Sequence, residues 1–253
     1  MNVYLQQLLE KADALRTQLS GHRPFSPAAL AKVQQALDIA YTFESNRIEG
    51  NTLTLQETAL VVEEGLTIGG KSMREHLEAI NHFEAIAFIK EIARQELPVT
   101  QQLILQIHAL ILRGIDRANA GRWRTVPVLI SGSRHTPPPP FMIAEEMEHF
   151  INEFERRENE GEHPVLLAAF LHERLVNIHP FVDGNGRTSR LLMNLYLLRR
   201  GYVIVNIKGD LDHRLRYYTA LEESHTKAHS QSFRQLVAEK EIEALQAYLK
   251  LLS

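Results

Sequence analysis

The stretch from residue 179 to residue 190, His-Pro-Phe-Val-Asp-Gly-Asn-Gly-Arg-Thr-Ser-Arg, constrains most strongly how this chain folds. Gly184 and Gly186 permit a tight turn, and apolar residues at helical spacing begin directly after the second arginine. The pattern predicts a turn that leads straight into a helix. Backbone N–H groups at the start of that helix favour an anion, because the positive end of the helix dipole lies behind them.

The charged residues of this stretch suit a phosphate ligand. Arg187 and Arg190 are three positions apart, so both guanidinium groups reach one face of the helix near its N-terminus. Guanidinium groups bind phosphate oxygens through paired hydrogen bonds. Asp183 lies just outside the turn, where a phosphate would repel its carboxylate unless a hard cation bridged them, and Mg²⁺ is the natural bridge. We therefore expect a phosphate site with a magnesium ligand.

Composition excludes several other classes of site. The 253 residues carry a net charge of −3, so no overall field attracts nucleic acid or an anionic membrane. The chain contains no cysteine, which rules out disulfides, thiolate zinc sites and cysteine nucleophiles. The mixed apolar and charged N-terminus leads us to expect no signal peptide, and no window approaches the roughly 18 apolar residues of a membrane span. We expect a cytoplasmic protein with neither a nucleic-acid partner nor a membrane partner.

Helical periodicity covers most of the chain. The expected helices span about 2–20, 27–46, 72–93, 143–159, 164–177, 186–200, 212–224 and 230–252, with two more opened by a Thr54/Glu57 capping box and by Pro98 or Thr100. Residues 203 to 205 are β-branched but have no partner run nearby, so we expect an extended loop there.

Residues 114 to 140 have a different character. A short β-prone run ends at Ile130, a Ser-Gly-Ser turn follows, and four consecutive prolines begin at Pro137. This pattern predicts a small β-hairpin flap at about 125–137. No repeat or linker divides the chain, so the expected fold is one all-α domain, a helical bundle with a small hairpin.

At every specified position, residues 179 to 190 fit the pattern HxFxDGNGRxxR of the Fic family, and the chain resembles the metazoan-type branch with an N-terminal inhibitory helix. The likeness extends from Ser45 through Gly121-Arg122-Trp123-Arg124 and the flap to Tyr217. It implies a single unit over 1–253. Residues 1–95 would form a helical region with the inhibitory motif, and 96–253 the Fic core with the flap and the C-terminal helices.

The resemblance implies a protein adenylyltransferase, which moves AMP from Mg-ATP to a Ser, Thr or Tyr hydroxyl of a target protein. His179 would be the catalytic base, Asp183 the metal ligand and Phe181 a core anchor. Histidine suits the first role because its pKa lies near neutrality. The nucleotide-binding residues that the resemblance implies are Gly184, Asn185, Gly186, Arg187, Arg190 and Tyr217. His225 stands where similar proteins carry an asparagine that contacts the nucleotide, so the base selectivity is left open.

A second motif, Ser45-Asn46-Arg47-Ile48-Glu49-Gly50, resembles the family's inhibitory motif (S/T)xxxE(G/N). The resemblance implies that Glu49 pairs with Arg190 and competes with the terminal phosphate of ATP. Ser45 would bond the same helix end. The protein would then be autoinhibited in cis. In some relatives the equivalent glutamate also supports removal of AMP, and that alternative stays open.

The flap carries the last implied site. Ile130, Ser131, Gly132 and Ser133 match the family's target-binding segment, which holds the target by main-chain pairing. Two alternatives remain. One is transfer of another phosphate-containing group, including kinase-like transfer, and the other is a silent nucleotide-sensing interaction module. Relatives often form homodimers, and composition does not decide the oligomeric state. His76, His82, His108, His163 and His172 show no ligand spacing, so we expect no zinc site.

Overall fold

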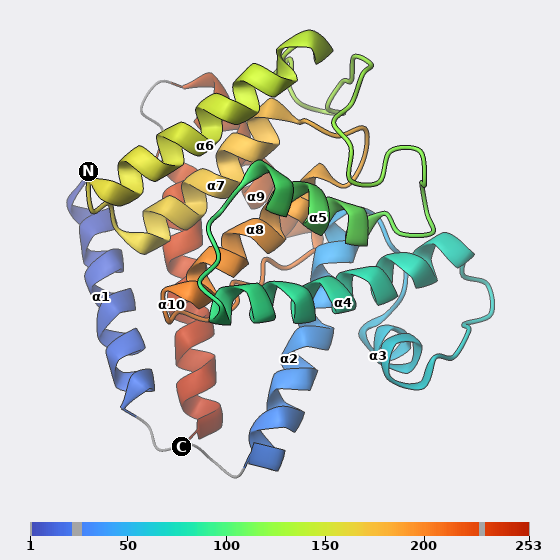
Figure 1. The fold of residues 1–253 in the computed structure, drawn as a ribbon. Helices are drawn as coiled ribbons and strands as arrows, with labels where there is room; N and C mark the ends of the chain where they lie inside the picture. Colours follow the sequence, from blue (N-terminus) through green and yellow to red (C-terminus); the bar gives the residue numbers. More distant parts are fainter. Residues whose placement is uncertain (1, 22–26, 228–230, 253) are drawn as a thin grey trace.

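The computed structural model describes residues 2–21, 27–227 and 231–252 and is all-α in this part of the chain (Figure 1). Its ten α-helices are α1 Val3–Ser20, α2 Pro27–Ile48, α3 Leu55–Glu64, α4 Met73–Arg94, α5 Gln101–Ile111, α6 Ile143–Asn159, α7 Pro164–Ile178, α8 Asn185–Arg199, α9 Leu211–Thr226 and α10 Ser232–Leu252. A short 3-10 turn, η1 Pro140–Met142, precedes α6. The expected helical fold is confirmed.

Helix α8 lies at the centre of the bundle and packs against α7, α4, α5 and α2 (Figure 1). Leu191, Leu192, Leu195 and Tyr196 are all completely buried, so the helix is enclosed on every side. Burying one large apolar side chain stabilises the fold by about 1.5–3 kcal/mol. The motif helix is therefore fixed within the core, while α1 and α10 run side by side at one edge.

Helix boundaries follow the capping residues. The capping box of Thr54 with Glu57 is present at the start of α3, and Ser72 with Glu75 forms another at the start of α4. Helix α2 continues two residues further than expected, to Ile48, and ends before Gly50, whose φ is +95°. Ser45 and Asn46 thus lie inside the last turns of α2.

The hairpin expected at 125–137 is not found, since the described residues contain no strand. The chain does turn at the expected place, where the Ser133 N–H donates to the Ile130 carbonyl. The flanking prolines lack N–H groups and cannot build a ladder. The loop is held instead by side chains, because Glu222 of α9 accepts hydrogen bonds from the Ser133 hydroxyl and the Arg134 N–H.

Residues 203 to 205 form the expected extended loop and are buried. The Asn194 side chain takes the place of a strand partner: its Nδ2 donates to the Val205 carbonyl at 3.0 Å and its Oδ1 accepts from the Val205 N–H at 2.8 Å. Glu241 of α10 accepts from the Val203 N–H at 3.1 Å. These side chains satisfy backbone groups that would otherwise be buried without partners.

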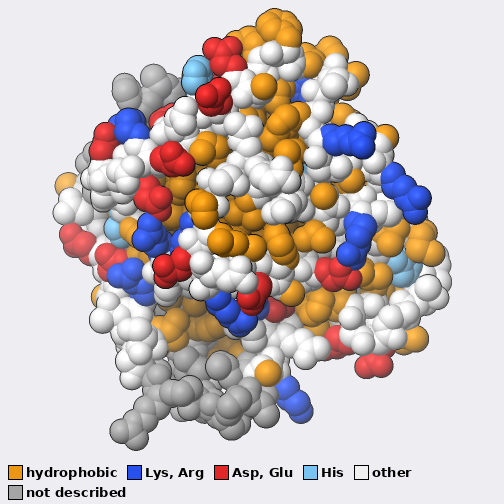
Figure 2. All heavy atoms as spheres, viewed as in Figure 1, with side chains coloured by type: hydrophobic (Ala, Val, Ile, Leu, Met, Phe, Trp, Pro, Cys, Tyr) orange, Lys and Arg blue, Asp and Glu red, His pale blue; other side chains and the backbone are white. Residues whose placement is uncertain are grey.

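Charged groups of both signs are scattered over the face drawn in Figure 2, as the small net charge leads one to expect. Within the described residues, no helix combines the length and the apolar composition needed to cross a membrane.

Glu241 makes the stability of the fold depend on pH. Burial raises the pKa of Glu241 from its ordinary 4.5 to about 8, and its Oε2 has no hydrogen-bond partner among the described residues. Between these pH values the folded protein binds more protons than the unfolded chain, so stability falls as pH rises. Glu241→Gln, which resembles the protonated acid, should raise the melting temperature more at pH 8 than at pH 4.5.

Thermal unfolding at the two pH values tests this expectation. The matched control is Glu148→Gln, an exposed carboxylate of α6, which should change little at either pH. An equal shift for Glu241→Gln at both pH values would contradict the assignment.

Candidate active site

The motif loop joins α7 to α8 and is held in part by hydrogen bonds of its own residues. His179 ends α7 in the left-handed conformation, with φ +50°, and its N–H donates to the Leu175 carbonyl. Asn185 clips the loop, since its side chain accepts from the Phe181 N–H at 3.0 Å and donates to the Phe181 carbonyl at 2.9 Å. The Asn185 side chain is therefore used to hold the loop. Of Asn185, only the backbone at the start of α8 is left to contact a ligand.

His108 supports the loop from α5. Its ring stacks on Phe181 with centroids 3.6 Å apart. Its Nδ1 accepts from the Gly121 N–H at 3.0 Å, so the proton lies on Nε2, which donates to the Asp183 carbonyl at 2.9 Å. Burial lowers the pKa of His108 to about 4, which keeps this pattern at neutral pH. A side chain at Gly184, whose φ is +80°, would press on the same ring.

Arg124 clamps the other side of the loop. Its Nε donates to the His179 carbonyl at 2.8 Å, its backbone N–H donates to the Pro180 carbonyl at 2.8 Å, and its Nη1 donates to the Val126 carbonyl of the flap at 3.0 Å. One buried guanidinium therefore fixes both the motif loop and the flap. Sequence reasoning placed Arg124 in the family pattern but gave it no role, because its acceptors in the motif loop are main-chain groups distant in sequence.

The His179 ring is poised as a base. Its Nδ1 lies 3.3 Å from the Val176 carbonyl, which can only accept, so Nδ1 carries the proton and Nε2 is left unprotonated. Burial lowers the pKa of His179 to about 4, with a smaller lowering from Arg124. The imidazole is therefore neutral at physiological pH and able to take a proton.

Arg187 is buried, with 3% of its side chain exposed, yet it is only partly paired. Its Nη2 donates to Asp183 Oδ1 at 3.2 Å. Its Nη1 lies 3.3 Å from Glu78 Oε1, but among the described residues neither Nη1 nor Nε makes a hydrogen bond. A buried guanidinium with unused donors is costly, so the arrangement suits an additional anion such as a phosphate.

Asp183 suits a hard cation. Its Oδ1 accepts from the Gly184 N–H at 2.6 Å, and its Oδ2 accepts from Arg74 at 2.5 Å. Although burial raises its pKa, Arg187, the Gly184 N–H and Arg74 lower it further, so the carboxylate is ionised. The described residues contain no cluster of three or more His, Asp or Glu for a metal. A lone carboxylate still fits Mg²⁺, which keeps several waters and completes its shell with substrate phosphates.

Arg190 carries a full charge into the core, with 1% of its side chain exposed. Its Nε donates to the Ser45 hydroxyl at 3.0 Å, and its Nη2 donates to the Ser45 carbonyl at 2.9 Å and to Glu49 Oε1 at 2.7 Å. Burial lowers its pKa, but Glu49 and the nearby Tyr217 and Tyr41 outweigh this effect and raise it. The contacts that the resemblance implies for Ser45 and Glu49 are both present.

Glu49 occupies the anion position at the start of α8. Gly184 is the N-cap and offers no side-chain cap, so the first N–H groups of α8 are open to an acceptor. A Cβ added at Gly186 would collide with Glu49 Oε1, which places the carboxylate directly against the helix start. Gly186 is thus needed for close approach, and 32% of the Glu49 side chain remains exposed.

The end of α2 is docked by contacts that sequence reasoning missed. The Gly209 N–H donates to Glu44 Oε2 at 2.7 Å, and a Cβ at Gly209 would lie only 2.9 Å from the Ile48 nitrogen. The Tyr218 hydroxyl donates to the Ile48 carbonyl at 3.2 Å. No local signal marks these residues, because they lie in segments far from α2 in the sequence.

Tyr217 and His225 lie on α9, on two different sides of the site. Tyr217 is buried behind Arg190, which donates to its hydroxyl at 3.4 Å, and the same hydroxyl lies 2.9 Å from His172 Nε2. It braces the arginine rather than lining an opening. The His225 ring lies 4.9 Å from that of His135, near His179, and burial lowers its pKa to about 4.

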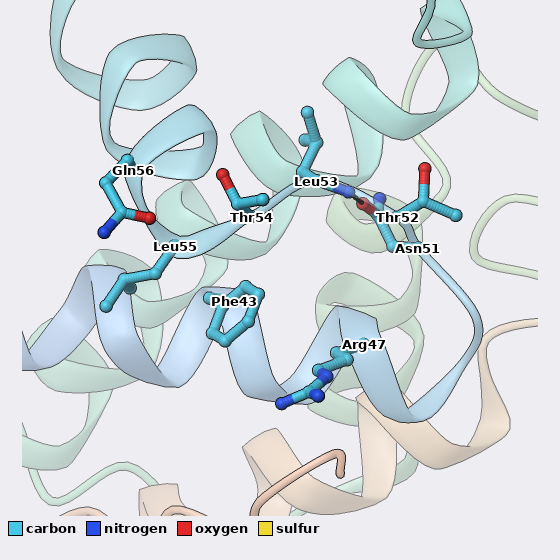
Figure 3. Close-up of a pocket in the computed structure, with 8 residues that line it drawn as sticks. All are labelled: Phe43, Arg47, Asn51, Thr52, Leu53, Thr54, Leu55 and Gln56. Atoms are coloured by element: carbon cyan, nitrogen blue, oxygen red, sulfur yellow. Dashed lines mark hydrogen bonds between the residues drawn. The ribbon is translucent and has the colours of Figure 1, made fainter.

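The flap residues Ile130 to Ser133 form a turn whose tip, Ser131 and Gly132, is exposed, and the neighbouring Leu129 is 88% exposed. A separate open cleft of about 380 Å³ lies beside the end of α2, lined by Phe43 and Arg47 and by residues 51–56 (Figure 3). None of the residues that line it belongs to the stretch 179–190. We therefore place the candidate active site at the α7–α8 loop and not in the cleft.

Comparison with known proteins agrees with this placement. The model of the Fic/DOC family matches residues 98–197. A solved structure of Fic-1 from C. elegans, with one glutamate changed to glycine, is 31% identical; the alignment covers 97% of this chain and 72% of that one, with a TM-score of 0.85. The chain belongs to the Fic family. The resemblance seen in the motifs is thereby confirmed.

Two other Fic proteins extend the comparison. A Fic domain containing signaling protein from Bacteroides thetaiotaomicron is 27% identical, covers 98% of this chain and 97% of its own, and has a TM-score of 0.84. The protein adenylyltransferase Fic of Drosophila grimshawi is 38% identical over 86% of this chain. This Fic chain spans 43% of the length of that relative.

The Glu49–Arg190 pair generates a prediction about nucleotide binding. Glu49→Gln leaves a buried guanidinium without its counter-charge, so we expect a loss of stability of about 1–3 kcal/mol. A triphosphate can replace the missing charge. Magnesium with an ATP analogue that has a methylene between the α- and β-phosphorus should therefore raise the melting temperature of Glu49→Gln more than that of the wild type.

Thermal shift with and without the analogue measures this effect. Glu64→Gln, an exposed change at the end of α3, is the control and should behave like the wild type. Equal ligand-induced shifts in all three proteins would rule out competition between Glu49 and the triphosphate.

Proposed function

We propose that this Fic protein is a protein adenylyltransferase that Glu49 holds inactive in cis. The observation that carries the proposal is the carboxylate of Glu49 at the start of α8, bonded to Arg190. The start of α8 and the buried Arg190 form an anion site that a carboxylate of the same chain now fills, while the unused donors of Arg187 suit an additional anion. A nucleotide triphosphate has the charge to take that position.

His179 would act on the hydroxyl of the target. Its unprotonated Nε2 takes the hydroxyl proton as the oxygen attacks the α-phosphorus of ATP. A bond forms between that oxygen and the α-phosphorus, the bond from the α-phosphorus to the bridging oxygen breaks, and pyrophosphate leaves. The two hydroxyl side chains of the motif, Thr188 and Ser189, are fully buried, so the nucleophile is assigned to a Ser, Thr or Tyr of a partner protein.

The positive groups would stabilise the charge that develops on the phosphates. Arg187 and the N–H groups at the start of α8 are fixed before the substrate arrives, and fixed donors in a dry site stabilise a transition state strongly. Asp183 is the residue that would hold the magnesium ion. When bound, this ion supplies positive charge to the phosphate oxygens without changing the position of the base.

Inhibition would act on the position of the triphosphate. While Glu49 holds Arg190, the last phosphate has no counter-charge at that position, and the chain of phosphates cannot settle with the α-phosphorus opposite His179. Ser45 strengthens this state by holding two nitrogens of the same guanidinium. Removing Glu49 should free Arg190 for the phosphate.

The names of the relatives support the proposal: curated proteins at 36–38% identity are named protein adenylyltransferase Fic. The exposed flap supports the assignment of a protein target. Among the described residues, the main-chain groups of Ser131 and Gly132 have no backbone hydrogen bond, so they can pair with an extended segment of a partner.

Labelled ATP tests the function. Wild type, Glu49→Gly, His179→Ala and the control Glu64→Ala are incubated with cell lysate and ATP labelled on either the α- or the γ-phosphate. We expect α-label on protein, at least tenfold stronger for Glu49→Gly than for the wild type, and none for His179→Ala. Glu64→Ala should match the wild type, because its side chain lies away from the site.

The labelling pattern also separates the other functions. Transfer of γ-label would replace the proposal with kinase-like chemistry. Absence of both labels with Glu49→Gly would favour a nucleotide-sensing module. Loss of α-label from a pre-modified target on addition of the wild type, but not of Glu49→Gly, would show that Glu49 serves AMP removal as well.

A further inference from the structure

We propose that Arg74 competes with the divalent cation for Asp183 and so sets the cation concentration at which the site loads. This inference rests on the proposed function, which makes Asp183 the metal ligand. Arg74 lies in the first turn of α4, outside both motifs. Its Nη2 is 2.5 Å from Asp183 Oδ2, so a guanidinium occupies the carboxylate that the cation needs.

The two oxygens of Asp183 are used differently. Oδ1 accepts from the Gly184 N–H at 2.6 Å and from Arg187 at 3.2 Å, and both donors are part of the motif. Among the described residues, the hydrogen bond to Oδ2 comes from Arg74 alone. A cation that binds Oδ2 would face a second positive charge at contact distance, and the two repel each other. Loading therefore requires Arg74 to move away.

Arg74 is able to leave, whereas Arg187 is not. The Arg74 side chain is 57% exposed, so water can hydrate it after release, while Arg187 is enclosed. Glu78 offers Arg74 a second partner one turn along α4, with its Oε1 3.1 Å from the Arg74 Nε. Exposed ion pairs are weak, which makes the exchange inexpensive. The competition is consequently reversible.

The charge balance of the site also favours release of Arg74 when a cation binds. Arg74, Arg187, Glu78 and Asp183 form a ring of two positive and two negative groups. A divalent cation adds two positive charges to this ring, and release of Arg74 toward solvent removes one from contact with Asp183. Glu78 also accepts from Asn51 Nδ2 at 3.0 Å, so the ring touches the loop that follows the inhibitory helix.

Calorimetric titration with ADP, with and without MgCl₂, tests the proposal without any transfer reaction. The ratio of the two dissociation constants measures how much the cation contributes. In Arg74→Gln this ratio should exceed that of the wild type by about three- to tenfold. Arg74→Lys keeps the charge but loses the planar guanidinium group, so its ratio should lie between those of the wild type and Arg74→Gln. Arg94→Gln, at the far end of the same helix, should match the wild type.

Each outcome has one meaning. A ratio in Arg74→Gln that equals or falls below the wild-type ratio overturns the competition. A larger ratio supports it even if no α-label is transferred in the functional test, so the two proposals fail separately. If ADP binds but magnesium changes its affinity in none of the four proteins, both the metal role of Asp183 and the competition are wrong.

Discussion

The buried charge of Arg190 is the constraint on which the rest of this site depends. A guanidinium cannot lose its proton at any physiological pH, so a chain that buries one must surround it with acceptors. Ser45, Glu49 and Tyr217 supply them here, from α2 and α9. The same need explains why the end of α2 and Tyr217 of α9, far apart in sequence, both contact Arg190. In the proposed function, a phosphate would take the place of the Glu49 carboxylate.

The catalytic loop is held from outside the twelve-residue motif. The His108 ring stacks on Phe181, and Arg124 donates to the His179 and Pro180 carbonyls. Both act on main-chain groups, so they hold the loop whatever substrate is bound. This division leaves Nε and Nη1 of Arg187 without hydrogen bonds among the described residues, while both oxygens of Asp183 remain bonded.

Contiguous patterns were predicted well, and contacts between distant segments were not. Caps such as Thr54 and Thr100 located helix starts within a residue or two, because capping depends on neighbours in the chain. The prediction of a hairpin was wrong because residues with high β-propensity form a strand only where a partner strand exists. The prolines lack the N–H groups that such pairing needs. Gly209 is needed because α2 approaches it closely in the folded structure, and the residues next to it in the sequence do not indicate this contact.

Glu49 and Arg190 are 141 positions apart yet belong to one chain, so their meeting is unimolecular. A tethered group acts at an effective concentration that dilution cannot change, and in the proposed function dissolved nucleotide would compete against it. Expression level would then leave the resting activity of each molecule unaltered. The resting activity would be set by the free energy with which the end of α2 docks. Contacts such as Glu44 with Gly209 and Tyr218 with Ile48 contribute to it. A mutation or a partner that acts there could change activity in small steps without touching the catalytic loop.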